Sequence, residues 1–173
     1  MAHFIIRTGV VLGVLLLASC SRSHDVTVLL ESGQCGRQLT SAALDWLTTP
    51  AQLERLIQYI NKHKAGGAML IGGPFDSSPE VLPVVDFGRS GVLLVEMGRR
   101  PTGGYRLGLV ENSLAVRDGI AQLSVDWQEP GDDDVVTQVV TSPCLLLALP
   151  HAGYHEIVVV DQHEQPRARL PLR

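Results

Sequence analysis

Apolar and polar residues alternate over residues 121–128, and an uninterrupted apolar run fills residues 144–149. A period of two predicts an antiparallel strand with one buried face and one wet face, whereas a short continuous apolar run predicts a strand buried on both sides. The chain is therefore predicted to consist mainly of β-strands. Further strands are predicted at 26–30, 84–87, 92–97, 105–110, 135–140 and 157–160.

One amphipathic helix is predicted from Pro50 to Lys62. Thr49 can cap its first turn, and Gln52, three residues later, completes a capping box that satisfies two backbone amides. Pro50 suits the first helical position, where its missing N–H would have no partner within the helix. We therefore predict an α+β fold, mainly an antiparallel β-sheet or a curled β-sandwich, with this helix packed on it. The predicted apolar face of the helix consists of Leu53, Leu56, Ile57 and Ile60.

The segment between two predicted strands, residues 98–109, reads GRRPTGGYRLGL. Proline fixes φ and two adjacent glycines permit positive φ, so the segment predicts an exposed, shaped loop that joins the two strands of a β-hairpin. Such loops often carry function because a scaffold presents them to solvent, although a plain hairpin turn is the alternative. Arginines in this loop can pair with carboxylates of a partner. The candidate partner-binding residues are Arg99, Arg100, Pro101 and Thr102, and the loop-shaping residues are Gly103, Gly104 and Tyr105.

Residues 1–19 are predicted to be a signal peptide rather than part of the fold. Arg7 precedes an apolar run over 10–17 that is too short to span a bilayer comfortably. The run ends in LASC, which resembles the lipobox of bacterial lipoproteins and implies cleavage before Cys20 and lipidation of that cysteine, including palmitate. Ser21 resembles an outer-membrane sorting signal, so the expected location is the cell envelope, facing the periplasm. An uncleaved anchor or an ordinary signal peptide is the alternative.

Two cysteines, Cys35 and Cys144, remain inside the predicted fold. An exported chain with two internal cysteines is a candidate for a disulfide bond, and two separate buried thiols are the alternative. Residues 20–25 are predicted to form a lipidated tether and residues 26–83 a strand and helix region. Residues 162–173 are predicted to be a tail with several arginines that is either loosely ordered or a short edge strand.

The chain has 173 residues and a formal net charge of −4, so it has no basic excess that would favour a nucleic-acid partner. GRSG at 88–91 lacks the last glycine of a nucleophile elbow. EPGDDD at 129–134 lacks the spacing of a calcium loop. We therefore predict that the protein is not an enzyme and uses no cofactor and no metal. The histidines near predicted turns, which do not define a zinc site, are His151, His155 and His163.

Two separated features carry a family resemblance: RRPTGGYRL at 99–107, and TSPC at 141–144 followed by an apolar strand. Their order and spacing resemble the C-terminal domain of the protease complex subunit PrcB family, and VDF at 85–87 is similar to the family's opening residues. Cys144 stands where the family pattern has tyrosine. The resemblance implies a PrcB-like β-domain over 84–161 in a secreted or lipid-anchored, non-enzymatic accessory protein.

We therefore expect a lipid-anchored envelope protein that acts as an accessory or stabilising subunit for another envelope protein. The family name makes a protease one candidate partner, and the lipid on Cys20 is the expected contact with the membrane. The alternative is a chagasin-like inhibitor of cysteine proteases, because PTGGY at 101–105 is similar in character to the loop of that family. Two later inhibitor segments of chagasin-type proteins have no counterpart in this chain.

Overall fold

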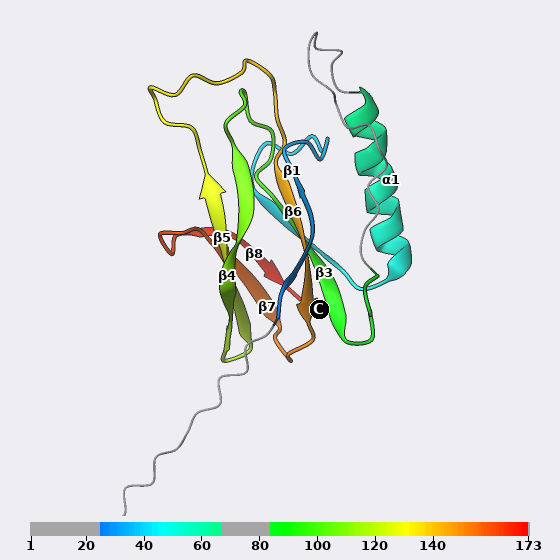
Figure 1. Cartoon of the computed structure of the whole chain (residues 1–173). Coiled ribbons are helices and arrows are strands. Elements are labelled where there is room, and N and C mark those ends of the chain that lie inside the picture. Colours follow the sequence, from blue (N-terminus) through cyan, green and yellow to red (C-terminus); the bar gives the residue numbers. More distant parts are fainter. Residues whose placement is uncertain (1–24, 67–83, 173) are drawn as a thin grey trace, which may run out of the picture.

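The structure is a computed structural model that describes residues 25–66 and 84–172 (Figure 1). The predicted signal peptide, Cys20 and most of the tether lie outside the described residues, as does the part of the strand and helix region over 67–83. Within the described part, the chain forms eight strands and one helix. These are β1 (Thr27–Ser32), β2 (Ala43–Leu47), α1 (Pro50–Gly66), β3 (Ser90–Glu96), β4 (Arg106–Arg117), β5 (Ile120–Gln128), β6 (Cys144–Pro150), β7 (Glu156–Val160) and β8 (Pro166–Pro171).

The strands form two four-stranded sheets. The first sheet has the order β1-β6-β3-β2 and is antiparallel throughout. The second has the order β4-β5-β7-β8, in which β5 and β7 run parallel because β6 carries the chain into the first sheet between them. The sheets face each other, and α1 lies on the outer side of the first sheet (Figure 1). This confirms the predicted α+β fold and its sandwich form.

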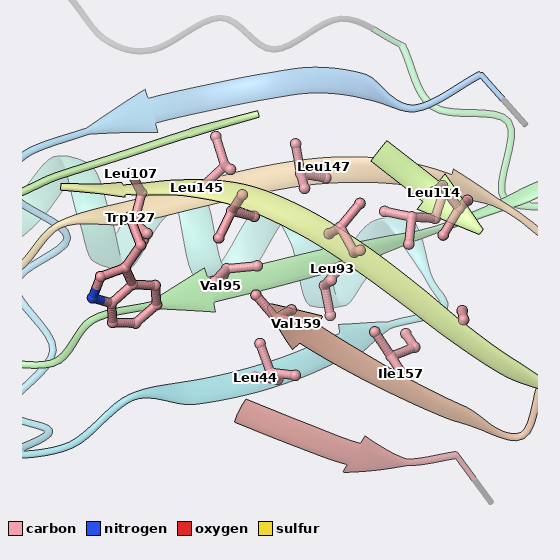
Figure 2. Close-up of a cluster of buried hydrophobic side chains, with 14 of the residues drawn as sticks. Leu44, Leu93, Val95, Leu107, Leu114, Trp127, Leu145, Leu147, Ile157 and Val159 are labelled. Carbon is pink, nitrogen blue, oxygen red and sulfur yellow. The ribbon is translucent and has the colours of Figure 1, made fainter. Parts of the chain in front are cut away.

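The uninterrupted apolar run of β6 is explained by its central place in the layers. Leu145, Leu147 and Leu149 are fully buried in the core between the two sheets (Figure 2). Cys144 and Leu146 are equally buried, but they belong to the cluster between the first sheet and α1. A strand that is covered on both faces has no position for a polar side chain, which confirms the prediction of burial on both sides.

The second sheet has one dry face and one wet face, as the alternation in β5 predicts. Leu123, Val125 and Trp127 are buried between the sheets, whereas Gln122 and Gln128 are exposed. Burial of the inner side chains removes apolar surface from water, and the outer face remains solvated. The pairing of β5 is antiparallel with β4 and parallel with β7, so only one side of this strand has the predicted antiparallel partner.

The predicted helix and its cap are confirmed. The side-chain oxygen of Gln52 accepts a hydrogen bond from the Thr49 amide at 3.0 Å, and the Thr49 hydroxyl accepts one from the Gln52 amide at 3.3 Å. Ile60 is fully buried, and Leu56 and Ile57 pack beside it on the first sheet. Within the described residues, no helix is both long and apolar enough to cross a membrane.

Two predicted strands are wrong. Residues 84–87 form irregular backbone and the start of a turn, in which the Asp86 carbonyl accepts hydrogen bonds from the amides of Arg89 and Ser90. Residues 135–140 are also irregular, and Val135 is fully exposed. Valine-rich runs favour extended backbone, but neither segment pairs with a strand of the described part of the chain. The segment before β6 must instead cross from the second sheet to the first.

The two strands that flank the PTGGY loop do not form the predicted hairpin. β3 belongs to the first sheet and β4 to the second, so residues 97–105 cross between the sheets.

The C-terminal tail forms β8, an edge strand that pairs antiparallel with β7, so the tail is a short edge strand rather than loosely ordered. β1 and β2 share the first sheet with β3 and β6, so the strand and helix region and the PrcB-like region contribute to one sandwich.

Candidate partner-binding site

Two chain segments cross between the sheets side by side: residues 97–105, which join β3 to β4, and residues 129–143, which join β5 to β6. We call them the paired crossings. The backbones of Arg100 and Thr141 exchange hydrogen bonds at 2.8 and 2.9 Å, and the Gly103 amide donates to the Thr137 carbonyl at 2.8 Å. Both crossings lie at one end of the sandwich (Figure 1). These bonds satisfy backbone groups of both segments, although neither segment is part of a sheet.

The residues predicted to shape the loop lie in the first of the paired crossings. Gly103 is buried, and a Cβ atom at this position would collide with the Thr137 hydroxyl. Gly104 has a φ of +86°, a conformation that L side chains rarely adopt. Tyr105 packs partly against the core between the sheets, and the Arg100 guanidinium lies 5.4 Å from the centre of its ring. These residues fix the crossing rather than the turn of a hairpin.

The four candidate partner-binding residues differ in exposure. Arg99 and Pro101 are exposed. Arg100 is partly buried, and its Nε atom has no hydrogen-bond partner within the described residues. The Thr102 carbonyl accepts a hydrogen bond from the Thr141 hydroxyl at 2.8 Å. Arg100 and Thr102 therefore hold the paired crossings together, and Arg99 and Pro101 are the two that face solvent.

A disulfide joins Cys35 to Cys144, as predicted, with the Cα atoms 6.0 Å apart and a sequence separation of 109 positions. Both cysteines are at most 1% exposed. The Cys35 amide also donates to the Ser142 carbonyl at 2.9 Å, and the Ser142 amide donates to the Gly33 carbonyl at 3.1 Å. The bond and these contacts fasten the segment after β1 to the second of the paired crossings.

The Ser142 side chain also joins the segment after β1 to the second crossing. Its hydroxyl accepts a hydrogen bond from the Gly36 amide at 2.9 Å and donates to Gln34 Oε1 at 2.6 Å. The Gln34 side-chain nitrogen in turn donates to the Val140 carbonyl at 3.0 Å. Ser142 is only 6% exposed, and the two bonds of its hydroxyl are half-buried. Together with the exposed bond from Gln34 to Val140, they fix the two backbones relative to each other.

A groove of about 390 Å³ lies between this attachment, the C-terminal part of α1 and the first of the paired crossings. We call it the cationic groove, because its described lining contains Arg37, Lys62, Arg99 and His63 but neither aspartate nor glutamate. The remaining lining residues are small or polar, apart from one valine. They are Gln34, Gly36, Gln38, Val140, Thr141 and Ser142.

A buried carboxyl group lies behind Arg37. Glu96, the last residue of β3, is 3% exposed, and its Oε2 atom lies 3.2 Å from Arg37 Nη1 without accepting a hydrogen bond from any described residue. Arg37 also pairs with Asp45 of β2. Burial raises the pKa of Glu96 to about 7, although the charge of Arg37 acts in the opposite direction. Two carboxyl groups thus hold the Arg37 guanidinium at the edge of the cationic groove.

Sequence reasoning found Arg99 but missed the other basic residues of the groove. Arg37 precedes β2, Lys62 and His63 lie on α1, and Arg99 belongs to a crossing more than thirty positions further along the chain. No motif spacing connects these positions. The one available signal was the predicted pairing of Cys35 with Cys144, which places residue 37 beside the TSPC segment.

The arrangement defines a small sandwich of two sheets and one helix, with a pre-formed polar groove at the end where its crossings meet. Residues 92–150 of this sandwich match the family model described as PrcB C-terminal. The match confirms the predicted PrcB-like domain and spans β3 to β6 with both crossings, which is less than half of the chain. The VDF segment at 85–87 precedes it. No curated protein and no solved structure matches the chain.

Proposed function

We propose that this protein is a non-catalytic accessory subunit, held at the bacterial cell envelope by lipid on Cys20, that binds another envelope protein through its cationic groove and paired crossings. The observation that carries the proposal is the PrcB C-terminal match, because it includes both crossings and therefore Arg99, Thr141 and Ser142 of the groove. The family name, which refers to a protease complex, makes a protease the first partner to test.

The rigidity of the site supports a role in binding. The disulfide, the Ser142 contacts and the bonds between the paired crossings fix the groove before any partner arrives. A partner that docks on a fixed surface loses less conformational entropy than one that must order a loop. The same geometry disfavours the chagasin-like alternative, because the PTGGY segment is hydrogen-bonded to the second crossing at Thr102 and Gly103.

The groups of the groove that resemble catalytic residues already have structural partners. The Ser142 hydroxyl is bonded to Gly36 and Gln34. His63 Nδ1 lies 2.8 Å from the Tyr59 carbonyl, and the two rings are stacked with centres 4.0 Å apart. A nucleophile needs a base within hydrogen-bond reach, and each of these side chains is held by a different neighbour. This supports binding rather than catalysis.

The place where the described chain enters the fold suits an anchor at Cys20 with the groove facing away from the membrane. Thr27, at the start of β1, pairs with Ala148 near the end of β6, whereas Ser32 pairs with Cys144 beside the groove. The described chain therefore enters the fold at the end opposite the cationic groove (Figure 1). A strand of six residues separates the two ends by roughly 20 Å. A lipid at Cys20 would leave the groove accessible to a periplasmic partner.

The test is affinity capture of the full-length lipoprotein from native envelopes after crosslinking. We expect a specific envelope protein to be recovered with the wild type and lost with Arg99→Glu. Arg117→Glu, which makes the same charge change at the exposed end of β4, should retain it. Equal recovery with both variants would contradict the assigned surface.

The anchor is tested separately with a palmitate label. The wild type should incorporate the label and Cys20→Ser should not. Labelling that survives this substitution would contradict lipidation at Cys20.

A further inference from the structure

We propose that the cationic groove binds a carboxylate-rich segment of a protein partner, with Arg99 and Lys62 as the charged contacts. The inference rests on the proposed function and adds the chemistry of the partner. The positive side chains reach the groove from three separate parts of the chain, and no acidic residue is part of its described lining. This local excess of positive charge contrasts with the net charge of −4 of the whole chain.

The charged side chains are presented by fixed backbone. The Arg99 amide donates to the Leu39 carbonyl at 2.6 Å, which ties the first crossing to the segment that carries Arg37. Arg37 is held by Asp45 and Glu96, so its charge is largely compensated, and it contributes shape and hydrogen-bond donors more than net charge. Lys62 is exposed on α1. The net attraction for an anion therefore comes mainly from Arg99 and Lys62.

Polar groups between the cations suit a peptide segment. Gln38 and Thr141 line the groove beside Arg99. His63 Nδ1 must carry a proton to bond the Tyr59 carbonyl, because a carbonyl only accepts, so its Nε2 is the ring nitrogen left for a ligand. An acidic segment offers carboxylates to Arg99 and Lys62, and its backbone offers donors and acceptors to these polar groups. The groove volume suits a few side chains rather than a whole helix.

The place of the groove favours a protein segment over a lipid headgroup as the source of the anion. The described chain enters at the opposite end of the sandwich, so a lipid anchor at Cys20 would keep the groove away from the bilayer surface. A soluble or periplasmic segment reaches it without this constraint. The occupant we infer is therefore an exposed run of glutamate or aspartate on the partner.

The experiment uses the purified full chain in detergent and a fluorescent peptide with four consecutive glutamates, followed by anisotropy at 50 and 300 mM salt. We expect binding at low salt that weakens at high salt. Arg99→Glu and Lys62→Glu should each weaken it by about tenfold or more, which corresponds to about 1.4 kcal/mol. Arg117→Glu should bind like the wild type, and circular dichroism should show that all variants are folded.

Three control ligands separate the alternatives. A peptide with four glutamines should bind at least about tenfold more weakly; equal binding would overturn the role of charge. Inorganic phosphate at millimolar concentration should not displace the peptide; full displacement would indicate a small-anion site. Phosphatidylglycerol vesicles should not bind through Arg99; Arg99-dependent binding to them would assign the groove to lipid. The peptide experiment uses no cellular partner. Failure of peptide binding would therefore contradict the inferred chemistry of the partner, whereas failure of the capture experiment would contradict the proposed function.

Discussion

Two carboxyl groups in different regions of the molecule are buried to nearly the same degree. Glu96 ends β3 behind the cationic groove and is 3% exposed, and Asp161 follows β7 at the turn into β8 and is 1% exposed. Asp161 Oδ1 accepts hydrogen bonds from the amides of His163 and Gln165 at 2.8 and 2.9 Å. Its Oδ2 atom lies 2.8 Å from both Nε and Nη2 of Arg167. Among the described residues, Glu96 has only its ion pair with Arg37.

The difference in partners reverses the effect of burial. Burial acts to raise the pKa of Asp161, but the amides of Gln165 and His163 and the Arg167 guanidinium lower it below its usual value. For Glu96 burial wins, and its pKa rises to about 7. The ionised Asp161 carboxylate therefore stabilises the turn after β7. The ionised Glu96 carboxylate, which is buried with fewer partners, destabilises the region behind the groove. Such a cost is typical of regions selected for function rather than for stability.

The largest expected effect is loss of the disulfide, which is the covalent support of the groove region. Cys35→Ser with Cys144→Ser should lower the free energy of unfolding by about 4 kcal/mol, because a closed loop of this length restricts the unfolded chain. Urea unfolding with and without reductant measures the effect. Reductant should not change the stability of the double variant. A loss below about 1 kcal/mol would show that the Ser142 contacts suffice.

Removal of the well-satisfied carboxylate should have the next largest effect. Asp161→Ala should cost about 3 kcal/mol at pH 7, because it leaves Arg167 and two backbone amides without their acceptor in a buried site. Asp132→Ala, in an exposed turn, is the control and should cost less than about 0.5 kcal/mol. Equal losses for the two variants would contradict the structural role of Asp161.

Asp161 also predicts how the wild type responds to acid. Its pKa is lower in the folded state than in the unfolded chain, so its contribution is fully present above the unfolded pKa of about 3.8. That contribution is lost as the pH falls through the lowered folded value. Urea unfolding of Asp161→Ala should therefore show a smaller loss of stability below pH 4 than the wild type. An equal loss of stability below pH 4 in the variant and the wild type would contradict this role of Asp161.

The elements predicted from the sequence are those whose signal is local. The alternation in β5, the continuous apolar run of β6 and the capping box of α1 depend on neighbours within a few positions, and each element formed as predicted. The pairing of Cys35 with Cys144 was also predicted, because an exported chain with two internal cysteines offers one pairing. In each case the physical cause lies in the residues themselves or in their number.

The failed predictions concern choices between distant partners. Proline and glycines shape a turn, but they do not specify whether the next strand joins the same sheet, so residues 97–105 read as a hairpin although they cross between sheets. Residues 135–140 have strand-like composition but lie where no strand is available to pair with them. The cationic groove was only partly predicted, through Arg99, because its other walls come from α1 and the segment near Arg37.

The incompletely satisfied carboxyl group gives a pH-dependent prediction of opposite sign. The pKa of Glu96 is about 7 in the folded state against an ordinary 4.5, so the folded state holds more protons between these values, and stability falls as the pH rises through this window. Glu96→Gln should match the wild type near pH 4.5 and exceed it by about 1 to 2 kcal/mol at pH 8, because the neutral amide has no charge to bury. Urea midpoints from pH 4.5 to 8 test this, and a variant less stable at pH 8 would contradict it.

The smallest expected loss of stability comes from removing hydrogen bonds of the groove region while its disulfide is kept. Ser142→Ala removes the acceptor of the Gly36 amide and the donor to Gln34, and it should cost about 1 kcal/mol. In a double-mutant cycle, Gln34→Ala should cost less when Ser142 is already alanine, because the bond between the two side chains is then absent. Peptide binding should weaken with Ser142→Ala while the disulfide stays intact, since the segment that carries Gln34 and Gly36 loses its side-chain attachment to the second crossing. Unchanged peptide affinity together with reduced stability would show that Ser142 supports the fold but not peptide binding. The disulfide would then be the main support of the groove.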